Sequence, residues 1–350
     1  LTAARKQAAL RFEQDVCRQL TFMDMPNVKP PTVTLGDLER KFDRAAECSV
    51  ANYSFYLGAT NDNIDEVRRV DPRAVCGVKM FMGSSTGNML VDDERTLSAV
   101  FDSSPVVVAT HCEDEQRIRA HIEEFRARYG DDVTPAMHPL IRDAEACYLS
   151  SARAVELADR YRAELNLLHV STARELSLID AKPLIDKNIT AEVCVHHLWF
   201  TDEDYVRRGN RIKWNPAVKS AADRDALREG LLNGKVDLVA TDHAPHSDEE
   251  KSQPYWSCPS GGPSVQHSLV VMLELAQRGV LPVEKVVEKM CHAPAVRYGV
   301  VGRGFLREGY HADIVVVDPS KQQVVTRENV LYKCGWSPFE GERFSSSVEL

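Results

Sequence analysis

Three apolar segments of the chain each lead into a residue that could bind a metal ion. His111 ends the segment PVVVATH, His169 ends LNLLH, and Asp242 directly follows VDLVAT. The carboxyl ends of parallel strands meet at one mouth of a barrel, so these side chains are expected to lie together. Two imidazoles and a carboxylate suit Zn²⁺ or a similar divalent ion. Each residue alone could equally be a hydrogen-bonded group at a strand end, but all three on separate strands favour a metal site.

A fourth residue, Lys79, lies inside the segment VCGVKMF, where a buried strand is expected. Burial lowers the pKa of a lysine, and the neutral amine can react with carbon dioxide to give a carbamate, whose two oxygens can bridge two metal ions. Alternatively, Lys79 pairs with a buried acid or extends to the rim. The expected proximity of Lys79 to the three strand-end residues favours the carbamate. Asp242 would then be both a metal ligand and the base that takes a proton from the attacking water and returns it to the leaving nitrogen.

Two asparagines and a histidine are candidates for holding a substrate. Asn27 lies in MDMPN and Asn215 in KWNPAVKS, where prolines fix the turns, although either could be an ordinary Asx-turn. His246, four residues beyond Asp242, could donate to a substrate carboxylate. The segment PSGGP, which begins at Pro259, could let the backbone approach a ligand or could be only a turn.

The elements that must position these residues alternate along the chain. Seven short apolar runs, apolar throughout, predict strands buried on both faces. They lie at residues 20–25, 51–57, 74–81, 105–111, 164–169, 189–196 and 236–241. Amphipathic helices are expected at 114–129, 142–161, 222–232 and 264–278. The alternation indicates an α/β fold, and reactive residues after four different strands favour a (β/α)₈ TIM-type barrel whose first strand is missing.

The C-terminal part departs from this alternation. The run GYHADIVVVD predicts a strand over residues 309–317 that belongs to a small appended β-subdomain. We therefore expect a metal-dependent barrel over residues 1–300 and part of the small subdomain over 301–350.

The composition of the chain excludes some classes of binding partner. The formal net charge of −9 gives no electrostatic attraction for nucleic acid or an anionic membrane, which leaves a small-molecule substrate. No apolar run approaches the ~20 residues of a membrane helix. The nine cysteines form no CxxC pair, which indicates a reducing, cytoplasmic setting.

Taken in order, the motifs MDMPN, GVKMFMGSSTGN, THCEDE, LHVSTARE, KWNPAVKS and ATDHAPH resemble those of the dihydroorotases of the amidohydrolase superfamily, and of a bacterial branch in particular. The resemblance runs from about residue 21 to residue 344. It implies that His111 and His169 bind the second of two zinc ions, that Lys79 is the carbamylated bridge, and that Asp242 is both ligand and base. It also implies that Asn27, Asn215, His246 and, through its backbone, Pro259 hold the substrate. The implied reaction is the reversible hydrolysis of dihydroorotate to N-carbamoyl-aspartate in pyrimidine synthesis, by a homo-oligomer.

Two features depart from that family. The HxH motif and following Arg of the first barrel strand are not in the sequence, which suggests that an amino-terminal piece is absent. The segment RFEQDVCRQLT before MDMPN is bulky and charged where the family has small residues. Two alternatives therefore stay open: another cyclic amidase, such as a hydantoinase or allantoinase, and a non-catalytic scaffold related to dihydroorotase. The clustered candidates for carboxylate binding favour an anionic substrate.

Overall fold

The fold, described here from a computed structural model, is built on a parallel sheet. The structure describes residues 21–49, 51–83 and 89–349; expectations that concern residues 1–20 lie outside this part of the chain. Each strand pairs in parallel with the next, in the order β1 to β7. The strands are β1 (Thr21–Asp24), β2 (Asn52–Gly58), β3 (Gly77–Phe81), β4 (Val108–His111), β5 (Leu165–Leu167), β6 (Ile189–Cys194) and β7 (Leu238–Ala240). All seven predicted strands are confirmed.

The sheet is one strand short of a closed barrel. Within the described ranges, β1 and β7 each pair with a single neighbour, so the sheet is open between them. A barrel of this type closes with eight strands. The prediction that the first strand is missing agrees with this opening.

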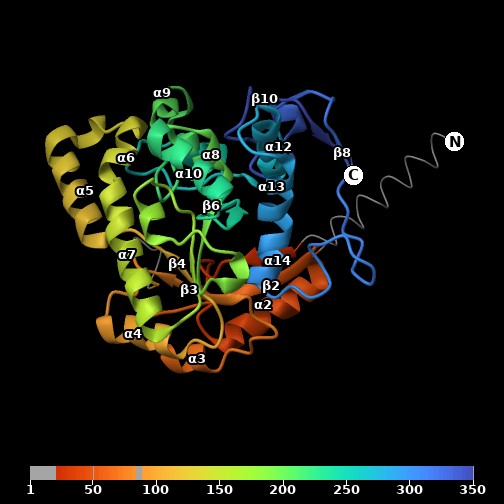
Figure 1. Cartoon of the computed structure of the whole chain (residues 1–350). Coiled ribbons are helices and arrows are strands. Elements are labelled where there is room, and N and C mark those ends of the chain that lie inside the picture. The colour runs from red at the N-terminus through yellow and green to blue at the C-terminus, as the bar shows by residue number, and fades with distance from the viewer. Residues whose placement is uncertain (1–20, 50, 84–88, 350) are drawn as a thin grey trace.

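A layer of helices surrounds the sheet (Figure 1). The longer ones are α2 (Leu35–Cys48), α4 (Glu94–Ser103), α5 (Glu115–Tyr129), α7 (Ala144–Tyr161), α10 (Ala221–Asn233) and α12 (Ser268–Gln277). The short ones are α3 (Ile64–Arg68), α6 (His138–Ile141), α8 (Val195–Trp199), α9 (Tyr205–Arg208), α11 (Asp248–Lys251), α13 (Val283–Val287) and α14 (Ala293–Arg297).

The four helices predicted from the sequence are confirmed as α5, α7, α10 and α12, with shifted starts. Asp114 and Asp143 are N-caps whose carboxylates accept backbone N–H groups of the first turn of α5 and α7, so these helices begin at Glu115 and Ala144, one and two residues after their predicted starts. Residues 265–267 form a 3₁₀ turn that precedes α12. In the part of the chain that is described, no helix combines the length and the apolar character needed to cross a bilayer.

Lys79 points into the barrel because of its register on β3. Successive side chains of a strand face opposite sides, and Val78 and Met80 pack in the large core between sheet and helices. Lys79 therefore faces the interior, where its lateral neighbours are Gly58 on β2 and Ala109 on β4. These small residues leave room for the long lysine side chain, which is 3% exposed.

The C-terminal segment corrects one prediction. The expected strand over 309–317 is wrong for residues 309–316, which have no regular structure. Instead β8 (Val317–Asp318) pairs antiparallel with β11 (Ser347–Val348), and β9 (Gln323–Val324) pairs with β10 (Arg343–Phe344). Ile314, Val315 and Val316 are all close to half exposed, so their apolar character is not satisfied by burial. An apolar run forms a strand only where another strand continues the ladder beside it. The predicted small β-subdomain is confirmed as these two short pairs.

Candidate active site

His111 and His169 meet at the carboxyl end of the sheet. His111 is the last residue of β4, and His169 lies two residues beyond β5 with a positive φ of 38°. The Nδ1 of His111 lies 3.0 Å from the Nε2 of His169, and both residues are buried. Burial lowers the pKa of both imidazoles, and the nearby charge of Lys79 lowers them further. Both rings are therefore neutral near pH 7, the form in which histidine binds metals.

A buried carboxylate fixes the orientation of His111. Glu113 lies 3.0 Å from the Nε2 of His111 and accepts from the Nε of Arg142 at 3.0 Å. Burial alone would raise the pKa of Glu113, but the charge of Arg142 and the bond with His111 outweigh it, so the pKa is lowered. An ionised Glu113 requires the proton of His111 to be on Nε2, which leaves a lone pair on Nδ1. This pairing of carboxylate and histidine is typical of metal-binding imidazoles.

Lys79 and Asp242 form the other half of the cluster. Burial lowers the pKa of Lys79 to about 8, against the opposing influence of Asp242. Burial raises the pKa of Asp242 to about 6, and Lys79 acts in the opposite direction. Asp242 has a positive φ of 42°, and its carbonyl accepts from the Nε1 of Trp214 at 3.3 Å. The amine of Lys79 is thus partly neutral near pH 8, and the carboxylate of Asp242 can accept a proton near pH 6. The two groups are close enough for the charge of each to shift the pKa of the other.

A further buried acid, Glu192, belongs to the same interior. It lies on β6, accepts from Asn166 at 3.1 Å, and burial raises its pKa to about 7 while Lys79 lowers it. Glu192 was not predicted from the sequence, although a charge inside an apolar strand is the signal that identified Lys79. Glu113, which stands two residues after His111 in THCEDE, was not predicted either, and for Arg142 the sequence holds no signal.

The predicted substrate-holding residues are dispersed among several loops. Asn215 precedes a cis peptide bond to Pro216, and its side-chain oxygen is buried without a hydrogen-bond partner in the described part of the chain. Asn27 is exposed on the loop after β1. The Nε2 of His246 lies 3.2 Å from the carbonyl oxygen of Ser260. The carbonyl of Pro259 already accepts from the Nζ of Lys251 at 2.9 Å. The assignment of these residues to substrate stays a prediction.

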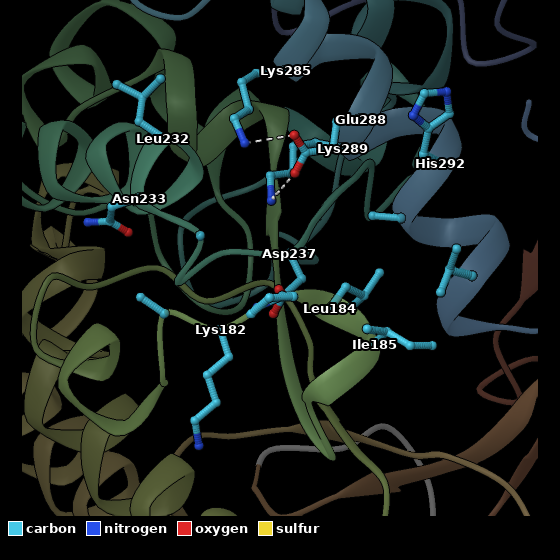
Figure 2. Close-up of a pocket in the computed structure, with 15 residues that line it drawn as sticks. Lys182, Leu184, Ile185, Leu232, Asn233, Asp237, Lys285, Glu288, Lys289 and His292 are labelled. Carbon is cyan, nitrogen blue, oxygen red and sulfur yellow. Dashed lines mark hydrogen bonds and ion pairs between the residues drawn. The ribbon is translucent and has the colours of Figure 1, made fainter.

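A cavity of about 560 Å³ lies away from the cluster, near the amino end of β7 (Figure 2). Figure 2 shows Lys285 and Lys289 both directed toward Glu288, at 2.7 and 3.0 Å. Asp237 is paired with Lys187 at 2.8 Å. Each of these lysines is paired with a carboxylate, and none of the candidate strand-end residues lines the cavity, so we assign it no part in the chemistry.

The strand-end residues suit a divalent metal. Two neutral imidazoles converge, a carboxylate stands behind one of them, and the Nδ1 of His169 is buried without a partner among the described residues. Nitrogen and oxygen donors of this kind match zinc-class ions.

Comparison with known proteins agrees with this chemistry. The Amidohydrolase family profile matches residues 21–338. A dihydroorotase of Methanosarcina acetivorans is 30% identical over 333 residues, which cover 92% of this chain and 70% of that protein. An allantoinase of Bacillus velezensis is 30% identical over 333 residues, covering 93% and 72%. The structure of an L-hydantoinase (dihydropyrimidinase) from Arthrobacter aurescens matches with a TM-score of 0.87 at 26% identity, over 96% of this chain and 77% of that one. These relatives are cyclic amide hydrolases, and the TIM-type fold is confirmed. The chain belongs to the amidohydrolase family.

Proposed function

We propose that this chain is a dihydroorotase, which reversibly hydrolyses the cyclic amide of dihydroorotate to N-carbamoyl-aspartate in pyrimidine synthesis. The observation that carries the proposal is the group formed by buried Lys79, His111 and His169 with the partly exposed Asp242, at one end of the sheet. The motifs, in their order along the sequence, and the similarity to a dihydroorotase over 92% of the chain support the choice of substrate.

The metal of this site is proposed to be Zn²⁺, with two ions in the complete site. His111 and His169 would hold one ion through the nitrogens that face each other, and Asp242 would add a carboxylate oxygen. Lys79, as a carbamate, would bridge the two ions. When bound, such ions lower the pKa of water and polarise a carbonyl.

Asp242 is proposed to move the proton. With a pKa of about 6, its carboxyl group is mostly ionised at neutral pH and can accept a proton from the water that attacks the amide carbon. As the ring C–N bond breaks, the same carboxyl group returns the proton to the leaving nitrogen. The hydrogen bond from Trp214 to the Asp242 carbonyl holds the backbone of this residue in place.

Substrate positioning is assigned to the loop residues. The side-chain oxygen of Asn215, which has no hydrogen-bond partner among the described residues, can accept an N–H of the substrate ring, and Asn27 and His246 can donate to the substrate carboxylate. Pro259 would contribute only through its backbone. We also place the protein in the cytoplasm as a homo-oligomer, by analogy with the family.

The test is hydrolysis of dihydroorotate, hydantoin and allantoin by the purified chain loaded with Zn²⁺. Preferred turnover of dihydroorotate is expected, and Asp242→Asn should lower kcat by at least about a hundredfold with an unchanged melting temperature. Asp65→Asn, which alters an exposed carboxylate on α3, is the control and should keep full activity.

A second candidate is another cyclic amidase. The similarity to an allantoinase and the structural match to a hydantoinase favour it. Preferred turnover of allantoin or hydantoin would establish this candidate and exclude dihydroorotase. Absence of turnover of all three substrates by the metal-loaded protein would instead support a scaffold.

A further inference from the structure

A second group of metal-binding side chains lies at the end of β6. Cys194 is the last residue of that strand, and His196 and His197 lie in the first turn of α8, which follows directly. One potential ligand atom from each of the three residues lies within 4.8 Å of the others. All three residues are buried, with exposures of 0%, 0% and 2%. None of them belongs to the cluster that the proposed hydrolysis uses.

Three ring nitrogens in this group have no hydrogen-bond partner within the part of the chain that the structure describes. Both nitrogens of His196 and the Nδ1 of His197 are buried without a hydrogen bond among the described residues. Buried polar atoms in folded proteins are nearly always bonded, because an unsatisfied donor or acceptor costs about 1–3 kcal/mol. Three such atoms beside one thiol indicate a partner outside the described residues, and a single ion could take one nitrogen from each ring.

The two imidazoles are already held in place. The Nε2 of His197 lies 3.2 Å from the carbonyl oxygen of Pro216, a bond that puts the proton on Nε2 and leaves a lone pair on Nδ1. The ring of His196 stacks on Trp214 with 4.1 Å between centroids and 8° between planes. A backbone carbonyl bonded to the far nitrogen is a usual support for a metal-binding histidine. The group is therefore ordered before any ion arrives.

We propose that Cys194, His196 and His197 bind one zinc-class cation, at a site additional to that of Lys79, His111, His169 and Asp242. One thiolate and two imidazoles are the ligand types that zinc prefers, and a water molecule can complete the tetrahedron. On binding, the S–H bond of Cys194 breaks, its proton passes to solvent, and a sulfur–metal bond forms without any redox change. The ion would tie the end of β6 to the turn of Trp214 and Pro216, between which Asn215 lies.

The ligand chemistry of the two sites makes them distinguishable. The four residues of the hydrolytic cluster offer only nitrogen and oxygen, so a thiolate–metal signal cannot come from them. The experiment takes the full chain, removes metal with a chelator, and titrates it with Co²⁺ while recording the near-ultraviolet thiolate-to-cobalt charge-transfer band. We expect a band that saturates with about one equivalent at this site. Cys194→Ser should abolish the band and lower the bound cobalt by about one equivalent.

Cys147→Ser is the matched control, since Cys147 is also a buried free cysteine but lies on α7, with its sulfur 3.6 Å from the hydroxyl of Ser171. It should keep the band. A band that survives in Cys194→Ser, or cobalt bound to the wild-type chain without any band, overturns the proposal and leaves ordered water as the partner of the histidines.

A measurement on the wild-type chain removes dependence on the folding of any variant. In the ¹¹³Cd NMR spectrum of the cadmium-loaded protein, we expect one resonance shifted in the direction that a single thiolate ligand produces. Resonances from nitrogen and oxygen coordination alone would contradict the proposal. Neither readout uses turnover, so both stand whether or not the proposed hydrolysis is correct.

Discussion

The hydrogen bond between Glu113 and His111 allows a sharp test of what holds His111 in the tautomer that can bind a metal ion together with His169. The substitution Glu113→Gln keeps the size of the side chain and removes its charge. An amide oxygen can still accept from Arg142, but the amide NH₂ then faces the Nε2 of His111 and donates to it. The proton of His111 would move to Nδ1, the nitrogen that faces His169. The variant thus favours the tautomer that cannot bind metal.

Two magnitudes follow from this geometry. Loss of an outer partner of a metal-binding histidine lowers metal affinity by about 10- to 100-fold, which corresponds to about 1.4–2.8 kcal/mol. Arg142, 6% exposed, would also lose its buried counter-charge. Removing one partner of a buried ion pair costs about 3–5 kcal/mol of folding stability. Because the amide oxygen of the glutamine can still accept from Arg142, we expect a loss at the lower end of this range, about 3 kcal/mol.

The assay separates these two effects. Zinc affinity is measured by competition with a chromophoric chelator, and stability by urea unfolding of the metal-free chain. Glu175→Gln is the control, because Glu175 is equally buried but accepts from Ser151 at 2.8 Å and Thr172 at 2.9 Å rather than from a histidine. It should lose stability without losing zinc affinity. Equal zinc affinities for wild type and Glu113→Gln would refute the view that Glu113 sets the tautomer of His111.

Two other predictions concern the same interior. Burial raises the pKa of Glu192 from 4.5 to about 7, so the folded chain binds a proton more tightly than the unfolded chain, and stability must fall as pH rises through this window. The part of this loss that Glu192 causes in the metal-free protein should be about 3 kcal/mol. Asp242, whose pKa is raised to about 6, adds a loss of the same sign, so in urea unfolding at several pH values Glu192→Gln should reduce the slope without abolishing it; an unchanged slope would contradict the assignment. A Cβ on Gly83 would lie 1.7 Å from the backbone oxygen of Glu113. Gly83→Ala should therefore lower the folding stability by about 1–3 kcal/mol and weaken zinc binding. The control is Gly36→Ala, whose added Cβ would meet no atom nearer than 3.8 Å and which should cause neither effect. A wild-type melting temperature for Gly83→Ala would contradict the close packing of Gly83 against Glu113.

The strands and strand-end residues could be predicted because both follow from local sequence. A strand buried on both faces must be apolar along its length, and a polar residue directly after it is conspicuous, as with His111 and Asp242. What orients these residues is not local. Arg142 reaches Glu113 across 29 positions of the chain, and the packing of α6 and α7 against α5, which begins two residues after Glu113, brings the two together. The strand predicted at residues 309–316 was wrong for a related reason. Apolar composition indicates a tendency to be buried, whereas a strand also needs a neighbouring strand with which to pair.

Burial and a lowered pKa do not by themselves select a lysine for carbamylation. Among the described residues, three lysines are buried with a pKa lowered to about 8: Lys79, Lys213 and Lys251. The Nζ of Lys213 donates to the carbonyls of Tyr255 and Cys258 at 2.7 and 2.6 Å, and that of Lys251 donates to Pro259 and Gly261. These bonds hold the amines as ammonium donors. The Nζ of Lys79 instead lies 4.5 Å from the ring centroid of Phe81, in the field of Asp242 and Glu192.

That surrounding charge should couple the carbamate to the metal. When the amine of Lys79 takes up carbon dioxide and releases a proton, a cation or neutral group becomes an anion in the field of the carboxyl groups of Asp242 and Glu192, which is unfavourable without divalent cations. With ¹³C-bicarbonate, a carbamate carbon signal is therefore expected in the zinc-loaded protein and not in the metal-free protein. Lys79→Ala should lose the signal and Lys213→Ala should keep it. An equal signal without zinc would mean that the acids near Lys79 are protonated, and the charge balance argued for this interior would be wrong.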